Sequence, residues 1–269
     1  MKHQNRKVFY SKTEDNIFLP PTYVANLRKN LSPLEARRKL HGEWADDPKG
    51  IVYSEYTHDV HFIDADYEIN PALPIFLSWD FNIGEGKPLS MCVGQYDEDA
   101  DMFHFFEESV IDGARTNESC EDLAMRGVLD HDSLYLVTGD GTGHARSTKS
   151  LQSDYEIIEK YLANYVRPDG KNINFKMVQP RSNPPIKKRH NSVNAYLRND
   201  LGDIRLFIYK GCKTLATGFR TTKLKKGGAY IEDDSNRYQH ITTGGGYAIC
   251  SIPRAIKSLY ELDNFQING

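Results

Sequence analysis

Two aspartates end apolar runs of the sequence and could meet in the folded chain. Asp80 ends the run 75–80 (Ile-Phe-Leu-Ser-Trp-Asp), and Asp140 ends the run 133–140 (Ser-Leu-Tyr-Leu-Val-Thr-Gly-Asp). In an open α/β sheet, ligands bind outside the carboxyl ends of the strands, near the points where the strand order reverses. If the two runs are neighbouring strands, the carboxylates of Asp80 and Asp140 repel each other, and a bound divalent cation usually offsets such a repulsion. Each aspartate could instead be an ordinary turn residue at a strand end.

A second acidic group lies later in the chain, where Glu232, Asp233 and Asp234 precede His240. Three carboxylates from distant segments can hold two Mg²⁺ or Mn²⁺ ions about 3.5–4 Å apart, which activates water and stabilises the leaving oxygen of a phosphodiester. Oxygen ligands favour these hard ions over zinc, although the acidic triplet could also be a solvated loop. The candidate catalytic residues are Asp80, Asp140 and Asp234. The candidate metal ligands are Asp80, Asp140, Asp233, Asp234 and His240.

Lysine and arginine gather in two segments near the acidic triplet, at 187–190 and 220–226. Basic runs are usually only solvated faces of a protein. Here, however, Gly227 and Gly228 would let the backbone approach a phosphate chain closely, and such contacts hold the DNA backbone with little base specificity. The candidate DNA-binding residues are Lys187, Lys188, Arg189, Arg220, Lys223, Lys225 and Lys226.

The composition of the chain excludes several classes of protein. Its 269 residues carry 34 basic and 37 acidic side chains, a net charge of −3 that excludes a histone-like protein and a polyacidic tail protein. No apolar run approaches the roughly 18–20 residues of a membrane helix, and the polar start of the sequence has no apolar stretch to serve as a signal peptide, so we expect neither membrane insertion nor export. The four cysteines are spaced unlike zinc ligands, so we expect reduced thiols and no zinc site. The sequence also lacks a P-loop, so ATP hydrolysis by this chain is not expected.

The hydrophobic pattern predicts the elements that position these residues. Strands are predicted at 75–80, 90–96, 102–107, 133–140, 174–178 and 204–208. Helices are predicted at 23–30, 33–40, 116–128, 153–166, 186–197, 212–220 and 248–259, the last of them open to interruption at Pro253. This order predicts an α/β fold whose mixed sheet joins a three-stranded meander to parallel strands and is flanked by helices. Such a sheet occurs in the ribonuclease-H-like architecture.

The first part of the chain has a less regular sequence pattern than the rest. Ser32, Pro33 and Glu35 give a helix start signal there, and the tract from Trp44 to Tyr56 is irregular. We therefore predict an N-terminal arm or linker at 1–70, packed on a ribonuclease-H-like domain at 71–269.

Several blocks of the sequence, in this order, resemble the nuclease domain of the large terminase subunit of tailed bacteriophages. Segments 79–82 (WDFN) and 138–141 (TGDG) are similar to the two metal-ligand strands of that family. The other similar blocks are 16–24 (NIFLPPTYV), 31–38 (LSPLEARR), 42–44 (GEW), 183–194 (NPPIKKRHNSVN), 205–208 (RLFI) and 212–213 (CK). The resemblance implies a ribonuclease-H-like fold and a Mg²⁺- or Mn²⁺-dependent endonuclease, which uses two metal ions to cut concatemeric double-stranded DNA during packaging.

The resemblance also implies partners and a place of action. The partners would be double-stranded DNA, the portal protein, the small terminase subunit and an ATPase motor domain, without a membrane, in the host cell cytoplasm and outside the mature virion. The motor is missing from this sequence, so the chain is similar to an isolated nuclease domain.

One departure from the family affects the third ligand, and other functions stay open. The family pattern His-x-x-Asp supplies that ligand, whereas the matching residues here run from His240 to Thr243. Asp233 or Asp234 could replace it, water could complete the shell, or metal affinity could be lower. The chain could then be a DNA-binding or docking module that is catalytically weak alone. Another ribonuclease-H-like enzyme, such as a resolvase or transposase, fits the acidic residues but not segment 16–44.

Overall fold

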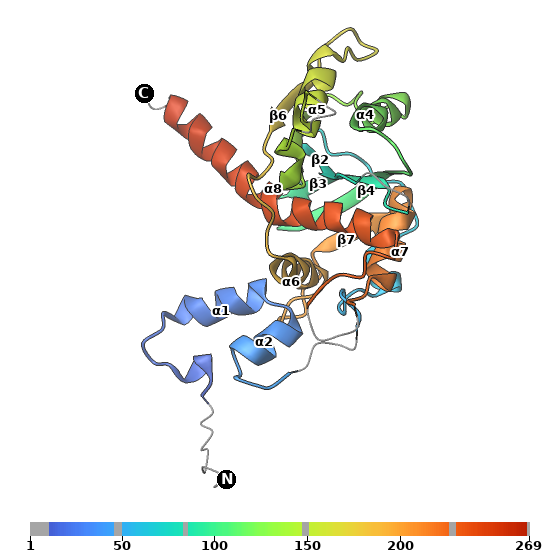
Figure 1. Cartoon of the computed structure of the whole chain (residues 1–269). Helices are drawn as coiled ribbons and strands as arrows, with labels where there is room; N and C mark the ends of the chain where they lie inside the picture. The colour runs from blue at the N-terminus through green and yellow to red at the C-terminus, as the bar shows by residue number, and fades with distance from the viewer. Residues whose placement is uncertain (1–10, 46–49, 83–85, 147–150, 226–229, 268–269) are drawn as a thin grey trace.

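A seven-stranded mixed sheet forms the centre of the computed structural model, which describes residues 11–45, 50–82, 86–146, 151–225 and 230–267 (Figure 1). Its strand order is β1-β7-β4-β3-β2-β5-β6. The strands are β1 (Phe62–Ile63), β2 (Ile75–Asp80), β3 (Leu89–Asp97), β4 (Met102–Ile111), β5 (Leu134–Gly139), β6 (Asn174–Met177) and β7 (Leu206–Tyr209). The helices are α1 (Pro21–Asn30), α2 (Pro33–Lys39), α3 (His58–His61), α4 (Thr116–Met125), α5 (Asp154–Asn164), α6 (Ile186–Leu197), α7 (Lys213–Thr221) and α8 (Tyr238–Ile267), with short 3₁₀ turns η1 (Thr13–Asp15), η2 (Gly141–His144) and η3 (Lys210–Cys212).

The pairing of the strands confirms the predicted mixed sheet. β2, β3 and β4 form an antiparallel meander, β5 runs parallel to β2, and β6 runs parallel to β5. On the other side of the meander, β7 is parallel to β4 and β1 is parallel to β7. Each predicted strand is present with slightly different ends, whereas β1 and α3 are too short to give a hydrophobic pattern and were missed.

Successive side chains of β2 face two separate cores, as the two-residue period of a strand requires. Leu77 and Trp79 pack in the core that includes residues of α4 and α5. Phe76 packs in the other core, with residues of α6, α7 and α8. Ser78 lies on this second face and donates a hydrogen bond to Gly244 O of α8 at 2.7 Å. The same alternation places Asp80 on the α8 face, and Figure 1 shows α8 crossing the sheet there.

A capping box begins α5 and helps to place its first turn. Ser153 Oγ accepts a hydrogen bond from Glu156 N at 3.3 Å, while Ser153 N donates to Glu156 Oε2 at 2.7 Å. The same turn carries Tyr155, whose hydroxyl donates to Asp140 O at 2.9 Å. The start of α5 therefore supports the loop that follows β5.

The last helix is longer than the sequence predicts. α8 begins at Tyr238, ten residues before the predicted start at Ala248, and it runs through Pro253 to Ile267 without interruption. The predicted start was wrong because the segment 242–246 (Thr-Thr-Gly-Gly-Gly) has low helix propensity. Packing overrides that propensity, since a Cβ on Gly246 would lie only 2.8 Å from Arg189 Cγ of α6.

The N-terminal segment contacts the rest of the chain through α1 and the loop after α6. Arg28 pairs with Asp200 at 2.7 Å, and Arg205 donates to the backbone oxygen of Lys29 at 2.8 Å. The predicted arm, 1–70, also supplies strand β1 to the sheet edge. Its boundary with the domain remains a prediction.

Two expectations from composition can be compared with the structure. All four cysteines are free thiols, and Cys92, Cys120 and Cys212 are buried. Within the described ranges, no helix combines the length and the apolar character that crossing a bilayer would need.

Candidate functional site

The structure brings Asp80 and Asp140 together at one edge of the sheet. β2 and β5 are parallel neighbours whose last register pair is Trp79 with Gly139, and Asp140 N donates to Trp79 O at 2.9 Å. The next residues along the two strands are therefore the two aspartates. Asp80 is 5% exposed and Asp140 is 8% exposed, so two carboxylates are buried side by side. A pair of this kind is costly unless a cation or hydrogen bonds compensate it.

Gly139 makes this close approach of the two strands possible. Its φ of +144° lies in a region that residues with a Cβ rarely adopt. A Cβ there would also lie 2.3 Å from Trp79 O. The glycine before Asp140 is therefore required by the geometry of the site.

Backbone and side-chain donors fix the Asp140 carboxylate. Its Oδ1 accepts hydrogen bonds from Thr142 N and from Asn183 Nδ2, both at 2.7 Å. Asn183 Oδ1 in turn accepts from Gly141 N at 2.7 Å, which fixes the orientation of the amide. Asn183 is a positioning residue that the sequence analysis placed in a family block without giving it a role.

The Asp80 carboxylate lies against α8. Its Oδ2 accepts a hydrogen bond from Asn82 Nδ2 and lies 3.2 Å from His240 Nδ1. Burial raises the pKa of Asp80, the contact with His240 opposes the rise, and the charge of Asp140 adds to it. His240 is 5% exposed, and its Nε2 has no hydrogen-bond partner among the described residues. The structure thus brings His240 to the aspartate pair, on the first turn of α8 and not in a loop before it.

We expect Asp80 to make the stability of the metal-free protein depend on pH. A carboxyl whose pKa is raised by folding binds its proton more tightly in the folded state, so stability falls as pH rises from the unfolded value of about 3.9. Asp80→Asn removes this loss. The variant's advantage over wild type in the free energy of unfolding, measured in EDTA, should therefore grow from about pH 4 to about pH 7. It should grow by about 1.4 kcal/mol for each unit by which folding raises the pKa of Asp80. Urea unfolding at several pH values measures this difference in stability. A difference between wild type and variant that stays the same at every pH would contradict the prediction.

The other two predicted acidic ligands have partners of their own. Asp233 Oδ1 accepts from the hydroxyl of Ser235 at 2.7 Å. Asp234 pairs with Lys225 at 2.5 Å and with Lys87 at 3.3 Å. Within the part of the chain that the structure describes, no three His, Cys, Asp or Glu side chains are grouped to hold a metal ion. The structure therefore does not join Asp233 or Asp234 to the aspartate pair.

Glu232 belongs to a buried ion-pair network that the sequence analysis did not foresee. Arg189 Nη2 donates to both carboxylate oxygens, at 2.8 and 2.7 Å, and His190 Nε2 lies 2.7 Å from Glu232 Oε1. Burial by itself would raise the pKa of Glu232, but the hydrogen bond with His190 and the charge of Arg189 lower it to about 2. Arg189, a candidate DNA contact, is 3% exposed and is engaged by this carboxylate instead of facing solvent.

The remaining candidate DNA-binding residues lie nearer the surface. Lys187 and Lys188 lie on α6, Arg220 lies on α7, and Lys223 and Lys225 follow α7. All five are exposed. Lys226 lies outside the described residues, as do Gly227 and Gly228.

An open cleft of about 520 Å³ is linked to the aspartate pair through Asn183, although neither aspartate lines it. Asn183, which holds Asp140, lines one part of it, and Tyr247 of α8 lines another. Lys188 and Arg254 bring positive charge to its walls. Arg254 was not among the candidates, because a single arginine on the last helix gives no cluster in the sequence.

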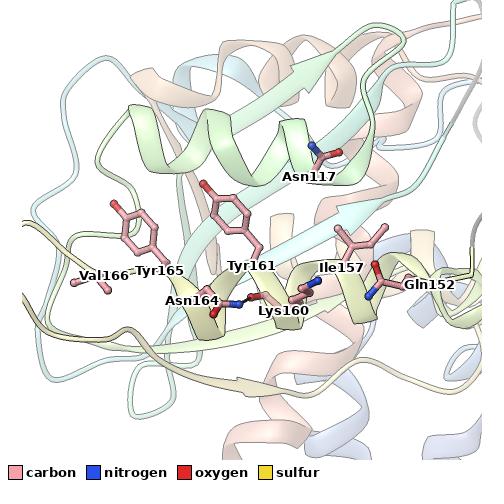
Figure 2. Close-up of a pocket in the computed structure, with 8 residues that line it drawn as sticks. All are labelled: Asn117, Gln152, Ile157, Lys160, Tyr161, Asn164, Tyr165 and Val166. Carbon is pink, nitrogen blue, oxygen red and sulfur yellow. Dashed lines mark hydrogen bonds between the residues drawn. The ribbon is translucent and has the colours of Figure 1, made fainter.

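A second hollow, of about 440 Å³, lies along α5 (Figure 2). Tyr161 of α5 and Tyr165, the residue after α5, project on the side of α4, from which Asn117 comes. Its lining includes Lys160 but no histidine, aspartate or glutamate. It therefore offers no carboxylate or imidazole ligand for a metal ion.

Solved structures resemble this chain although sequence comparisons find nothing. No family model and no curated protein matches it. The large terminase of a thermophilic bacteriophage matches with a TM-score of 0.57 at 13% identity, over 88% of this chain and 54% of that chain. The same terminase in complex with ATP-γ-S matches with a TM-score of 0.59 at 15% identity, over 90% of this chain and 55% of that chain. The P22 large terminase nuclease domain matches with a TM-score of 0.47 at 12% identity, over 72% of this chain and 92% of that chain.

The chain thus spans little more than half the length of the thermophilic-phage terminase that it matches. The match to that terminase agrees with the sheet described above, a meander joined to parallel strands between helices. This chain has the ribonuclease-H-like fold found in large terminases.

Proposed function

We propose that this chain is a Mg²⁺- or Mn²⁺-dependent DNA endonuclease domain of a viral genome-packaging terminase. It would hydrolyse phosphodiester bonds in concatemeric double-stranded DNA. The observation that supports this most is the position of Asp80 and Asp140, buried side by side at the carboxyl ends of β2 and β5.

The donor atoms of this pair suit a hard divalent cation. Carboxylate oxygens are the ligands that Mg²⁺ and Mn²⁺ prefer, and a cation would relieve the repulsion between two buried carboxylates. Asp80 and Asp140 would hold the ion, with His240 beside Asp80. A bound ion would supply an activated water and would neutralise charge on the phosphodiester.

The residues around the pair orient it before DNA arrives. Asn183 and Thr142 N hold one oxygen of Asp140, while Asn82 and His240 contact one oxygen of Asp80. Fixed ligands keep the reacting groups in place, and loss of such supporting contacts typically costs 10–100-fold in metal affinity or activity.

The cleft beside Asn183 is the place where we expect the DNA backbone to lie. Lys188 and Arg254 would contact phosphates there, without reading bases. The exposed Lys187, Arg220, Lys223 and Lys225 would add to the same attraction.

The double variant Lys188→Ala/Arg254→Ala should bind DNA more weakly at every sequence. Each lost phosphate contact should reduce the slope of log affinity against log salt by about 1. Fluorescence anisotropy with labelled duplexes at several salt concentrations measures this slope. Lys171→Ala, an exposed lysine that does not line the cleft, is the matched control. An unchanged slope in the double variant would show that Lys188 and Arg254 do not contact DNA phosphates in the cleft.

Asp80→Asn tests the proposed function itself. We expect wild-type protein to cut supercoiled plasmid in Mn²⁺ and not in EDTA. Asp80→Asn should reduce this cleavage by at least about 100-fold, because loss of a residue that only supports a metal ligand already costs about 10–100-fold in metal affinity or activity. Equal cleavage by both proteins would refute the assignment.

A second candidate is a docking module of the packaging machine that cuts weakly or not at all by itself. It is favoured by the finding that no three potential ligands are grouped for a metal among the described residues. Isothermal titration separates the two functions, because a docking module would bind no Mn²⁺ at millimolar concentration. In either case we expect the chain to act on DNA in the host cytoplasm with a motor ATPase, the portal protein and the small terminase subunit.

A further inference from the structure

A basic hollow of about 510 Å³ lies between the N-terminal segment and α6 (Figure 1). Arg38 and Lys39, from α2 and its last turn, line one wall, and Lys187 and Lys188 of α6 line the other. Of the described residues that line it, these four are basic and one, Glu35, is acidic. Because the whole chain has a net charge of −3, positive charge is concentrated in this hollow.

The basic hollow adjoins the cleft beside Asn183. The two share three lining residues, which are Asn30, Lys188 and Ser192. Asn183, at another part of the cleft, donates to the carboxylate of Asp140. One concave surface therefore leads from the neighbourhood of the aspartate pair, over α6, to α2.

The N-terminal segment is fixed on the domain, so this surface is formed before a ligand arrives. Arg205 is 4% exposed and donates to Lys29 O of α1 at 2.8 Å. In the opposite sense of pairing, Asp200 N, in the loop after α6, donates to Leu31 O at 2.9 Å. A preformed surface avoids the free-energy cost of ordering a segment when it binds.

A buried carboxylate orients two of the cations at the wall of the hollow. Glu35 is 3% exposed, and its two oxygens pair with Arg38 Nη1 at 3.0 Å and with Lys39 Nζ at 2.9 Å. Since two cations share one carboxylate, one positive charge remains uncompensated there. The side chain of Lys39 is 54% exposed, and an ammonium group has three donors, so it can hold Glu35 and a ligand together.

We propose that the N-terminal segment belongs to the DNA-binding surface: the DNA backbone continues from the cleft over α6 into the basic hollow, where Arg38, Lys39 and Lys187 contact phosphates. Lysine and arginine neutralise phosphates, and neutral side chains such as that of Asn191, which also lines the hollow, donate to phosphate oxygens. The inference rests on the proposed function, and it extends the DNA contacts to α2, where the sequence analysis placed none.

The salt dependence of DNA binding by the full chain tests this path. Lys39→Gln should reduce the slope of log affinity against log salt by about 1, measured by fluorescence anisotropy with labelled duplexes. Arg37→Gln is the matched control, because Arg37 lies on the same helix, is 55% exposed, pairs with Glu43 at 2.6 Å and does not line the hollow. Both variants lose one positive charge, and the control should keep the wild-type slope.

A second variant covers the case in which Lys39→Gln fails to fold, which circular dichroism would reveal. Lys187 is exposed and lines the hollow but not the cleft, so Lys187→Gln should also reduce the slope by about 1. Slopes of folded Lys39→Gln or of Lys187→Gln that equal the slope of Arg37→Gln would overturn the inference. Plasmid cleavage by the wild type in Mn²⁺ is measured separately, so the nuclease assignment can stand when this inference fails.

Discussion

Asp140→Asn should lower Mn²⁺-dependent cleavage of plasmid DNA by more than about 100-fold. The amide keeps an oxygen that can accept hydrogen bonds from Thr142 N and Asn183 Nδ2, so the loop after β5 retains its shape. The change removes the negative charge that would hold the cation beside Asp80. Because supporting contacts alone typically contribute 10–100-fold, loss of a direct ligand should cost at least as much.

A graded series makes this result specific to the site. Asn183→Ala keeps both carboxylates but removes a donor to Asp140, so we expect an intermediate loss of about 10–100-fold, with weaker Mn²⁺ binding. Asp66→Asn, whose side chain is 82% exposed, is the charge-matched control and should cut at the wild-type rate. Cleavage by Asp140→Asn at the wild-type rate would rule out the aspartate pair as the catalytic centre.

Glu232→Gln should destabilise the folded chain by about 3–5 kcal/mol. The substitution removes the carboxylate that receives both hydrogen bonds from Arg189, and it leaves a buried guanidinium without a counter-charge. Because the pKa of Glu232 is lowered to about 2, its carboxylate stabilises the fold above its unfolded value of about 4.3. Wild-type stability should therefore fall as pH drops toward 2, and the variant should lack this part of the loss.

Chemical unfolding at neutral pH measures the effect of Glu232→Gln, with two variants beside it. Arg189→Met/Glu232→Gln removes both charges and should be more stable than Glu232→Gln, since replacing a whole buried ion pair is far less costly than breaking it. Glu121→Gln, on an exposed position of α4, should stay within about 0.5 kcal/mol of wild type. If Glu232→Gln were as stable as Glu121→Gln, the buried network would not be a structural element.

The sheet and the aspartate pair could be predicted because both depend on local patterns. Runs 75–80 and 133–140 are apolar enough to be buried strands, and each ends on an aspartate. Parallel pairing of neighbouring strands then brings the two chain-distant residues together. The role of Asn183 could not be predicted in this way, because it depends on where a loop returns to the end of β5.

The start of α8 and the ion-pair network around Glu232 could not be predicted from the sequence, for a different reason. Three glycines and two threonines at 242–246 argue against a helix, and only their packing against the sheet and α6 explains why one forms. Arg189 and Glu232 are 43 residues apart, so nothing local marks them as partners. The sequence therefore predicts a DNA contact in the basic run and metal ligands or a solvated loop in the acidic run, whereas each run contributes one residue to a buried pair.

A crystal soaked in Mn²⁺, with its anomalous difference map, tests the central claim most directly. We predict a peak between the carboxylates of Asp80 and Asp140, and we predict its loss in crystals of Asp80→Asn. A peak at Asp233 or Asp234 with none at the aspartate pair, or no peak at all at millimolar Mn²⁺, would contradict the proposal that these two strand ends form the metal centre of a nuclease.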